Sequence, residues 1–396
     1  MKRLLLALAL LCMVAPSRAL AATIEELARA ASGDTLTIAV HGLEGHEATV
    51  RAFQRRFPDL RVDVTVQNPS SLAPRIVAEQ QNGIYAWDSW WGLTAAMNNV
   101  VLPAGGFEPI TDYLVLPEVR DPAAWRAPEF QYTSDRGPFV FVHSVNLDAT
   151  VLWNADVVRG LQLRNARDLL DPALRGRIAL RDPSLANNGA FSMAALYREE
   201  GPDFIRRLLT EQRPVVIENT RQLTDGALRG DYAIVIGGSG DNLGKCRRYG
   251  GCRTVRALPF GAYLAARGVS VLKHPPHPNA TRLWINWLLS REGQETYVRE
   301  WAKHQDAGAA SLRRDVSPDP RHIFAEPDYA DLGRYYRPGT DAGNPDLAAV
   351  QKIYRESRAR VPAPGSAWAV AIGSLVLLAV FLTRAASRAL TRPRGH

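Results

Sequence analysis

The chain has little cysteine, and this scarcity limits the chemistry that it can support. Of the three cysteines in 396 residues, Cys12 lies near the start, so only Cys246 and Cys252 remain in the body of the protein. Five residues separate them, which is not the C-x-x-C redox spacing, and no further cysteine or histidine lies close by in sequence. Because Gly250 and Gly251 make the intervening loop pliable, we expect a disulfide in an oxidising compartment. A metal site and a redox pair are the alternatives.

Several motifs that would indicate an enzyme or a nucleic-acid partner are also absent. The sequence has no H-E-x-x-H and no G-x-x-x-x-G-K-[ST]. The segment Gly237–Asp241 (GGSGD) resembles the nucleophile elbow G-x-S-x-G, but Asp241 stands where the second glycine is required. No basic run is interleaved with aromatic residues, so we expect no nucleic-acid partner. The sequence therefore predicts a protein that is not an enzyme and that needs no cofactor or resident metal.

The first 21 residues have the pattern of a secretory signal. Lys2 and Arg3 precede the uncharged run Leu4–Pro16, and the small residues Ala19 and Ala21 follow. A short basic segment, an apolar segment and an A-x-A site are typical of a cleaved signal peptide over 1–21. An uncleaved anchor is the alternative, although the apolar run is short for a bilayer.

The other end of the chain has the pattern of a membrane anchor. Residues 361–383 carry no charge, and as a helix they would extend about 34 Å, enough to cross a bilayer. Four arginines and no acidic residue follow in 384–396, which favours a cytoplasmic tail. We therefore expect a single-pass C-terminal transmembrane helix that holds an exported body at the periplasmic, extracytoplasmic face of the cytoplasmic membrane.

The two ends also account for most of the positive charge. The net charge is +8, but Lys2, Arg3, Arg18 and the four tail arginines supply most of it. The body between them carries about +1, so the basic composition reflects membrane topology rather than affinity for nucleic acid or anionic lipid.

The body is long enough for two lobes and alternates between strand-like and helix-like segments. About 340 residues exceed what one hydrophobic core usually organises. Strand patterns alternating with helical periodicity predict an α/β fold with mainly parallel sheets flanked by helices. Thr23 and Glu26 form a capping box for a short first helix. The predicted strands are 35–40, 61–66, 86–91, 177–180, 215–218, 232–236, 254–258 and 268–272, and the predicted helices are 47–57, 72–81, 189–200, 202–209, 222–228, 281–289, 294–301 and 346–358.

Several motifs occur in the order found in one known family. Asp168–Gly189 (DLLDPALRGRIALRDPSLANNG) leads from a helix end through a strand into a polar loop and a new helix, and it resembles the middle of the extracellular solute-binding proteins of ABC importers. TLTIAVHG, FQRRFPDLRVDV, IVAEQQNGIYAWDSWWG, LRGDYAIVIGGSGD and GVSVLKHPPHPNATRLWINWLLSREGQE are similar to further segments of that family. The similarity is to the type II branch that includes ferric-iron, phosphonate, thiamine and polyamine binders.

The resemblance implies a two-lobed type II periplasmic-binding-protein fold. Lobe 1 would combine 34–137 with 268–325, and lobe 2 would be 145–260. Strands near 138–142 and 259–272 would cross between them. A connector, 326–360, would pack on lobe 1 and lead to the anchor. Ligand would close the lobes around a small polar molecule, with an anionic organic compound as one candidate, and the closed form would deliver it to an inner-membrane permease. A membrane-tethered sensor or partner-presenting module is the alternative.

Strand ends supply the candidate ligand-binding residues of both lobes. In lobe 1 they are His41 and His46 in the first loop, with Trp90 and Trp91 at the end of a later strand. Adjacent residues point to opposite faces of a strand, so one tryptophan would pack in the core and Trp91 would meet the ligand. The histidines could instead face solvent or act as caps.

In lobe 2 the candidates come from two strand ends, with Asn187, Asn188 and Gly189 at a helix start and Ser239 and Asp241 after the next strand. Their alternative roles are helix capping and a flexible turn. Ferric-binding relatives commonly carry a tyrosine pair after the strand equivalent to 232–236, where this chain has GGSGDN. Tyr335 and Tyr336 are adjacent but lie beyond the matched region, where we expect a packing role. This departure argues against free ferric iron.

Overall fold

The computed structural model describes residues 22–41, 44–133, 136–239, 255–304, 309–319, 327–340 and 344–360. The chain forms two compact units: unit 1 comprises 1–145 and 266–321, and unit 2 comprises 146–265 and 322–396. The strands β5 (Val140–Asp148) and β11 (Tyr263–Leu272) each begin in one unit and end in the other. Both segments predicted to cross between the lobes therefore overlap a strand that passes from one unit to the other.

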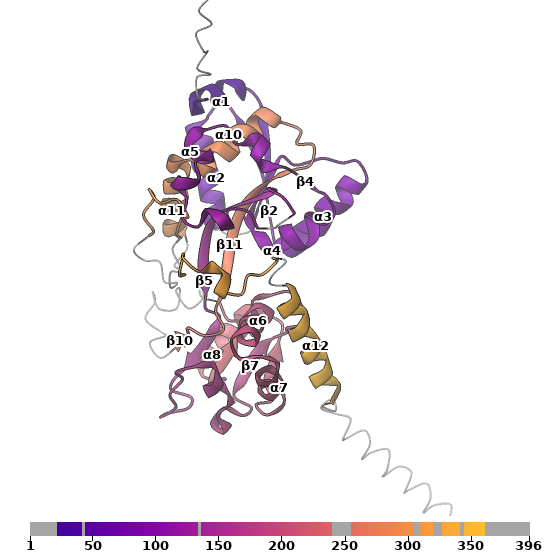
Figure 1. The fold of residues 1–396 in the computed structure, drawn as a ribbon, viewed down its shortest axis with the longest axis vertical. Coiled ribbons are helices and arrows are strands. Elements are labelled where there is room, and N and C mark those ends of the chain that lie inside the picture. The colour runs from indigo at the N-terminus through magenta and orange to yellow at the C-terminus, as the bar shows by residue number, and fades with distance from the viewer. Residues whose placement is uncertain are drawn as a thin grey trace, which may run out of the picture. The chain divides into compact units, whose positions relative to one another are not determined.

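Unit 1 is built on a six-stranded sheet (Figure 1). Its path is β2–β1–β3–β11–β4, and β5 pairs with β11. β1 runs parallel to β2 and β3, whereas β11 runs antiparallel to β3 and β4. The strand bounds not given above are β1 (Thr35–His41), β2 (Arg61–Gln67), β3 (Ser89–Leu93) and β4 (Phe107–Glu108).

Unit 2 is built on a five-stranded sheet with the order β10–β6–β9–β7–β8. β7 is parallel to β8 and β9, but β6 is antiparallel to β9 and β10. Both sheets are therefore mixed, and the prediction of mainly parallel sheets is wrong. The strands are β6 (Val151–Asn154), β7 (Ile178–Arg181), β8 (Val215–Ile217), β9 (Ile234–Ile236) and β10 (Val255–Ala257).

The antiparallel strands have a topological cause. A strand that follows a helical crossover on the same sheet runs parallel to its predecessor. β11 enters the unit 1 sheet directly from unit 2, and β6 follows β5 after only two residues. Neither strand is preceded by such a crossover, so the reason to expect a parallel pair does not apply to them.

Helices bury the apolar residues of the unit 1 sheet. α2 (Glu44–Arg56) packs on α11 (Arg291–His304), and α1 (Ile24–Ala30) packs on α10 (Pro278–Leu289). Phe53 lies 5.0 Å from both Trp284 and Trp287 between ring centroids. A second cluster joins Trp90 to α3 (Pro69–Gln81) and to the π-helical turn η1 (Met97–Val101). The remaining α-helices among the described residues of unit 1 are α4 (Thr94–Ala96) and α5 (Pro117–Arg120), and the 3-10 turns are η2 (Ile110–Tyr113), η3 (Pro122–Ala124) and η4 (Pro128–Phe130).

The central strands of unit 2 are buried on both faces, which explains their continuous apolar runs. In β7 and β9, Ile178, Leu180, Ile234 and Ile236 belong to one hydrophobic cluster, whereas the intervening Ala179 and Val235 belong to another. This alternation is the two-residue period of a strand. α6 (Asn188–Glu200) and α7 (Pro202–Thr210) contribute to the first cluster, and α8 (Thr220–Arg229) to the second.

The last described helix, α12 (Asn344–Arg360), belongs to unit 2. It packs on α6 and α7 (Figure 1). Its residues Leu347, Val350, Ile353 and Tyr354 belong to the same hydrophobic cluster as residues of those helices. The expectation that the connector 326–360 packs on the first lobe is therefore wrong. The apolar residues of α12 recur at helical spacing, but such a pattern does not identify the surface that they cover.

Local signals in the sequence predict a helix cap and a helix start that the structure contains. Thr23 and Glu26 form the predicted capping box, with reciprocal bonds of 2.8 and 3.2 Å. The stretch 168–189 contains β7 and ends in α6, one residue from its predicted start. The segment before β7, however, consists of two short 3-10 turns, η5 (Ala166–Leu170) and η6 (Pro172–Leu174), rather than the end of an α-helix.

Candidate functional site

The candidate residues of unit 2 meet at one edge of its sheet. β7 and β9 are parallel neighbours, so their C-terminal ends lie at the same edge. The loop after β7 leads to α6, and Gly237, Gly238 and Ser239 follow β9. The N–H groups of both glycines donate to the Thr150 carbonyl, at 3.0 and 2.9 Å. Asp241 lies outside the described residues.

Asn187 caps α6. Its side-chain oxygen accepts hydrogen bonds from the N–H groups of Gly189 (2.9 Å) and Ala190 (3.1 Å), and its amide nitrogen donates to the Asp182 carbonyl (2.7 Å). These bonds satisfy two of the first N–H groups of the helix. The capping interpretation of Asn187 is confirmed.

Asn188, at the start of α6, forms hydrogen bonds with the ends of β7 and β9. It positions Arg181, a cation that the sequence reasoning missed. Its Nδ2 donates to the carbonyls of Gly237 and Gly238, both at 2.9 Å, and its Oδ1 accepts from Arg181 Nη1 at 2.5 Å. Arg181 Nε donates to the Glu218 carbonyl at 3.2 Å. Partial burial lowers the pKa of Arg181, a guanidinium that remains charged at neutral pH. A charged residue directly after the apolar run of a strand, as in IALRDP, is the signal that could have identified it.

The glycines of this edge are required by close packing within the protein. A Cβ on Gly189 would lie 2.7 Å from Arg181 Cβ, and one on Gly237 would lie 2.7 Å from Gly189 Cα. Gly237 also has φ +95°, in the left-handed region. The strand ends and the helix start are therefore in direct contact, which fixes Arg181. Ser239 donates its N–H to Thr224 Oγ1 at 3.0 Å.

His46 lies in an aromatic box formed with Trp91 and Trp301, and His41 borders this box. His46, on α2, has no exposed surface, and its ring centroid lies 4.5 Å from that of Trp91 and 4.9 Å from that of Trp301. The ring centroid of His41, at the end of β1, lies 5.9 Å from that of His46. Burial lowers the pKa of His41 to about 4 and that of His46 well below its usual value, and nearby Arg267 contributes to both shifts. Both imidazoles are neutral at pH 7, and the solvent-facing alternative is wrong for His46.

The two adjacent tryptophans pack on opposite faces of β3, as a strand requires. Trp90 belongs to the cluster around α3, which confirms that one of the pair is a core residue. Trp91 also has no exposed surface, because His46, His143, Trp284 and Tyr297 enclose it. A ligand could contact its indole only if these side chains moved.

A hydrogen bond from Trp91 determines which ring nitrogen of His143 carries the proton. The indole Nε1–H donates to His143 Nε2 at 2.7 Å, so that nitrogen must carry a lone pair and Nδ1 must carry the proton. Nδ1 faces Gln294 Oε1 at 3.3 Å, and this oxygen also accepts from Ser311 Oγ at 2.7 Å. Burial lowers the pKa of His143 to about 3. His143 and Gln294 were missed because only tertiary packing brings them to Trp91.

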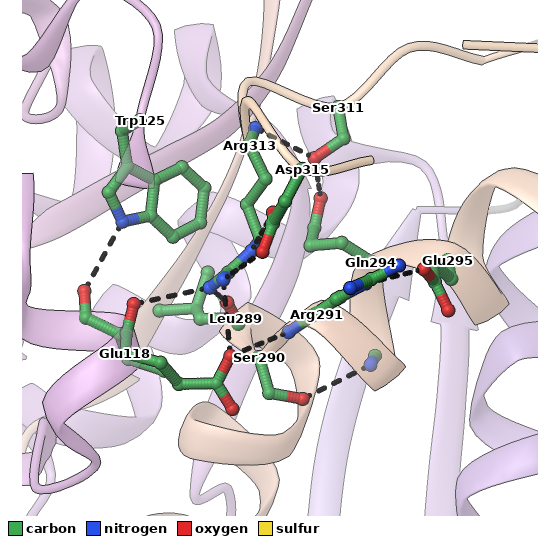
Figure 2. Close-up of polar contacts among 12 residues, drawn as sticks. Glu118, Trp125, Leu289, Ser290, Arg291, Gln294, Glu295, Ser311, Arg313 and Asp315 are labelled. Carbon is green, nitrogen blue, oxygen red and sulfur yellow. Dashed lines mark hydrogen bonds and ion pairs between the residues drawn. The ribbon is translucent and has the colours of Figure 1, made fainter. Parts of the chain in front are cut away.

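Ser311 connects Gln294, the neighbour of His143, to a buried arginine (Figure 2). Its Oγ accepts the N–H of Arg313, which is 2% exposed. The Arg313 guanidinium makes two 2.8 Å bonds to Asp315, a 3.1 Å ion pair with Glu118 and bonds to the carbonyls of Leu289 and Glu118. These contacts hold the returning segment 309–319 against α5 and the α10–α11 junction.

Several predicted features fall on parts of the chain that the structure leaves undescribed. They are the signal 1–21, Cys246, Cys252, the span 361–383 and the tail 384–396. Within the described ranges, no helix combines the length and apolarity needed to traverse a bilayer. The same ranges contain no group of three or more His, Cys, Asp or Glu side chains arranged to hold a metal ion.

Comparison with known proteins identifies a family and a fold. Residues 46–300 match the sequence model of the bacterial extracellular solute-binding proteins. An uncharacterized protein of Haemophilus influenzae is 24% identical over 256 residues, which cover 63% of this chain and 70% of that protein.

Among solved structures, iron-bound HitA from Pseudomonas aeruginosa superposes with a TM-score of 0.61 at 17% identity, covering 82% of this chain and 99% of that one. AfuA from Actinobacillus pleuropneumoniae, with fructose-6-phosphate bound, gives a TM-score of 0.56 at 18% identity. The match covers 82% of this chain and 99% of that chain. A two-component system protein described as mediating signal transduction gives a TM-score of 0.55 at 18% identity. The match covers 72% of this chain and 90% of that chain. These likenesses show a shared periplasmic-binding-protein fold.

Proposed function

This chain belongs to the bacterial extracellular solute-binding proteins, and from that membership we propose that it is the ligand-binding component of an ABC importer for a small organic anion. The family and its structural relatives are binding proteins, which confirms that the chain is not an enzyme. The family name also agrees with a location outside the cytoplasm. The transported ligand, the permease and the membrane anchor are the parts that we propose.

Arg181 carries the proposal of an anionic ligand. It stands at the C-terminal end of β7, the end at which α/β sheets bind ligands. Asn188 and the Glu218 carbonyl engage two of its three nitrogens and so hold the guanidinium in one orientation. A fixed guanidinium matches the two oxygens of a carboxylate or phosphate. The adjoining N-terminus of α6 adds partial positive charge.

The chemistry of this edge favours an organic anion over free ferric iron. One structural relative holds iron and another holds fructose-6-phosphate. In this chain, the Arg181 guanidinium stands at the sheet edge, and the segment after β9 reads GGSGDN, without tyrosine. Donors of this type suit phosphate and carboxylate oxygens, whereas iron requires anionic oxygen ligands.

Titration calorimetry of the full chain tests this proposal. The panel should contain sugar phosphates, phosphonates, organic carboxylates and ferric iron. We expect an organic anion to bind, and Arg181→Ala to weaken it about 10- to 100-fold, because a charged hydrogen bond contributes about 1.5–3 kcal/mol. Arg177→Ala is the matched control, since Arg177 precedes the same strand at its other end. Binding of ferric iron alone, or full affinity in Arg181→Ala, would contradict the proposal.

We further propose that the body is exported by the signal 1–21 and anchored by 361–383, with the tail 384–396 in the cytoplasm. Two observations support this: the sequence pattern of both ends, and the position of α12, which packs on unit 2 and ends at Arg360, directly before the predicted span. An anchored binding protein would stay close to its permease.

A membrane-tethered sensor is a second candidate function. The likeness to a two-component signalling protein favours it, because that protein covers 72% of this chain with the same fold. A deletion strain separates the two functions. Loss of ligand uptake with intact signalling supports transport, and loss of signalling with intact uptake supports sensing.

A further inference from the structure

Unit 2 contains a cavity that is separate from the strand-end residues described above. Its volume is about 400 Å³, and residues from η5, α6, the segment before β11 and the segment 334–336 form its walls. Arg198, Glu199 and Glu200 at the C-terminal end of α6 line it, whereas Asn188 begins that helix. At 1.5 Å per residue, Arg198 lies about 15 Å along the helix from Asn188. The cavity therefore lies near the opposite end of α6 from Arg181.

Two arginines of this cavity have guanidiniums that form no ion pair within the described residues, although Asp168 Oδ2 accepts the backbone N–H of Arg164 at 2.6 Å. Arg164 donates to Gln162 Oε1 at 2.5 Å, and the Arg334 guanidinium lies 5.4 Å from the centre of the Tyr335 ring. Neither forms a salt bridge within the described part of the chain. Both side chains belong to exposed residues, so a ligand can reach them.

The other charged groups of the cavity are already engaged. Arg198 pairs with Asp346 at 2.6 Å and donates to the Tyr335 carbonyl, and Glu200 pairs with Arg167 at 2.6 Å. Both carboxylate oxygens of Glu199 accept the Gly261 N–H, at 3.1 and 3.2 Å. Partial desolvation raises the pKa of Glu199. Arg164 and Arg334 are two positive charges against this one carboxylate, so the uncompensated charge of the walls is positive.

The rest of the wall is apolar and suits the carbon skeleton of an organic molecule. Leu147, Pro259, Phe260 and Ala262 contribute to it. Small-molecule sites typically combine such surfaces with a few placed polar groups in a volume of about 300–1,000 Å³. An inorganic ion would leave these apolar side chains without a partner.

We propose that this cavity is a second binding site, which takes a small organic anion through Arg164 and Arg334. The carboxylate or phosphate contacts the two guanidiniums, and the carbon skeleton packs on Phe260 and its apolar neighbours. Leu147 lies on β5 and Pro259–Ala262 lead into β11, the two strands on which the chain passes between its units. An occupied site therefore touches β5 and the segment that leads into β11, which gives this ligand a route to regulate the protein.

Calorimetry of the full-length protein with citrate, and separately with inorganic phosphate, tests the site. An Arg181→Ala background is used so that the strand-end residues do not contribute. We expect citrate to bind and the double variant Arg164→Ala/Arg334→Ala to weaken it at least tenfold. The control is Arg206→Ala, an exposed arginine of α7 that pairs with Asp203 outside the cavity. Because the replaced side chains are exposed, the unfolding temperature should not change.

Hydrogen exchange supplies a second readout, since citrate should protect the backbone amides of Phe260–Ala262 and Tyr335. Unchanged affinity in the double variant, equal weakening in Arg206→Ala, or no citrate binding in the Arg181→Ala background would each overturn the proposal. Phosphate binding as tightly as citrate would show a simple anion site and would reject the apolar contribution. None of these outcomes depends on the result for Arg181 itself, so this proposal and the importer proposal can fail separately.

Discussion

At the residue scale, histidines that are neutral in the folded protein contribute to how unit 1 responds to acid. The pKa is lowered to about 4 for His41 and about 3 for His143, and it lies well below 6.5 for His46. Each histidine is neutral in the folded protein but protonates below pH 6.5 once unfolded, so the unfolded state binds more protons. Stability is complete above pH 6.5 and falls as the pH drops toward the folded pKa values.

We therefore expect the unfolding free energy of unit 1 to fall between pH 6.5 and 4.5 by about 1.4 kcal/mol per pH unit for each buried histidine. Thermal unfolding of the full chain across this range measures it. His143→Gln removes one titrating group and retains an acceptor for Trp91 and a donor for Gln294, so its pH dependence should be shallower. A flat profile in the native chain, or equal slopes in both proteins, would contradict this explanation.

At the element scale, Arg313 fastens the returning segment 309–319 to unit 1. The side chain is buried, yet Asp315 and Glu118 are about half exposed, so the desolvation cost falls mainly on the guanidinium. Its planar fork satisfies two carboxylates and two carbonyls at once (Figure 2). Lysine has a single point charge and cannot reproduce this geometry.

Arg313→Met should destabilise unit 1 by about 3 kcal/mol, because it removes the hydrogen bonds of a buried guanidinium and leaves the carbonyls of Leu289 and Glu118 without these donors. In a unit of this size, the unfolding temperature should fall by roughly 6–12 °C. Arg313→Lys should recover only part of the loss. Arg314→Ala is the neighbouring control, since that side chain is exposed and should change stability by less than about 1 kcal/mol. Equal stability of the Met variant and the native chain would show that the network contributes little.

At the scale of the whole molecule, the proposed anchor decides where the protein resides. A chain ending after Arg360 keeps α12 and the core of unit 2, but it lacks the uncharged residues 361–383. We expect the full chain to sediment with membranes and to resist extraction with high salt or carbonate, whereas the shortened chain should be soluble in the periplasmic extract. Deletion of 384–396 alone is the control and should leave the protein in the membrane, since the span itself is retained.

A shortened chain that remains in the membrane fraction would show that attachment depends on another surface. A full chain recovered in the soluble extract would contradict the anchor itself. Because both results are read from fractionation alone, they do not depend on the identity of the ligand.

The position of most elements was readable in the sequence because their signals are local. Apolar periodicity located β1, β2 and α6 within a residue, and the cap of α1 was found from Thr23 and Glu26 alone. The family was likewise readable, since its motifs occur in order along the chain. Strand direction was not readable, because the pattern of a strand is the same whether its neighbour is parallel or antiparallel.

The sequence by itself therefore determined the α/β class, the family and the positions of most elements. Only the tertiary structure decided how the residues at the strand ends are used. In the tertiary structure, His46 and Trp91 are buried, Asn187 caps α6, Arg181 donates a hydrogen bond to Asn188, and α12 packs on the helices of unit 2. The physical reason is that these contacts join segments whose pairing depends on long-range packing, whereas capping and periodicity depend on neighbours in the chain.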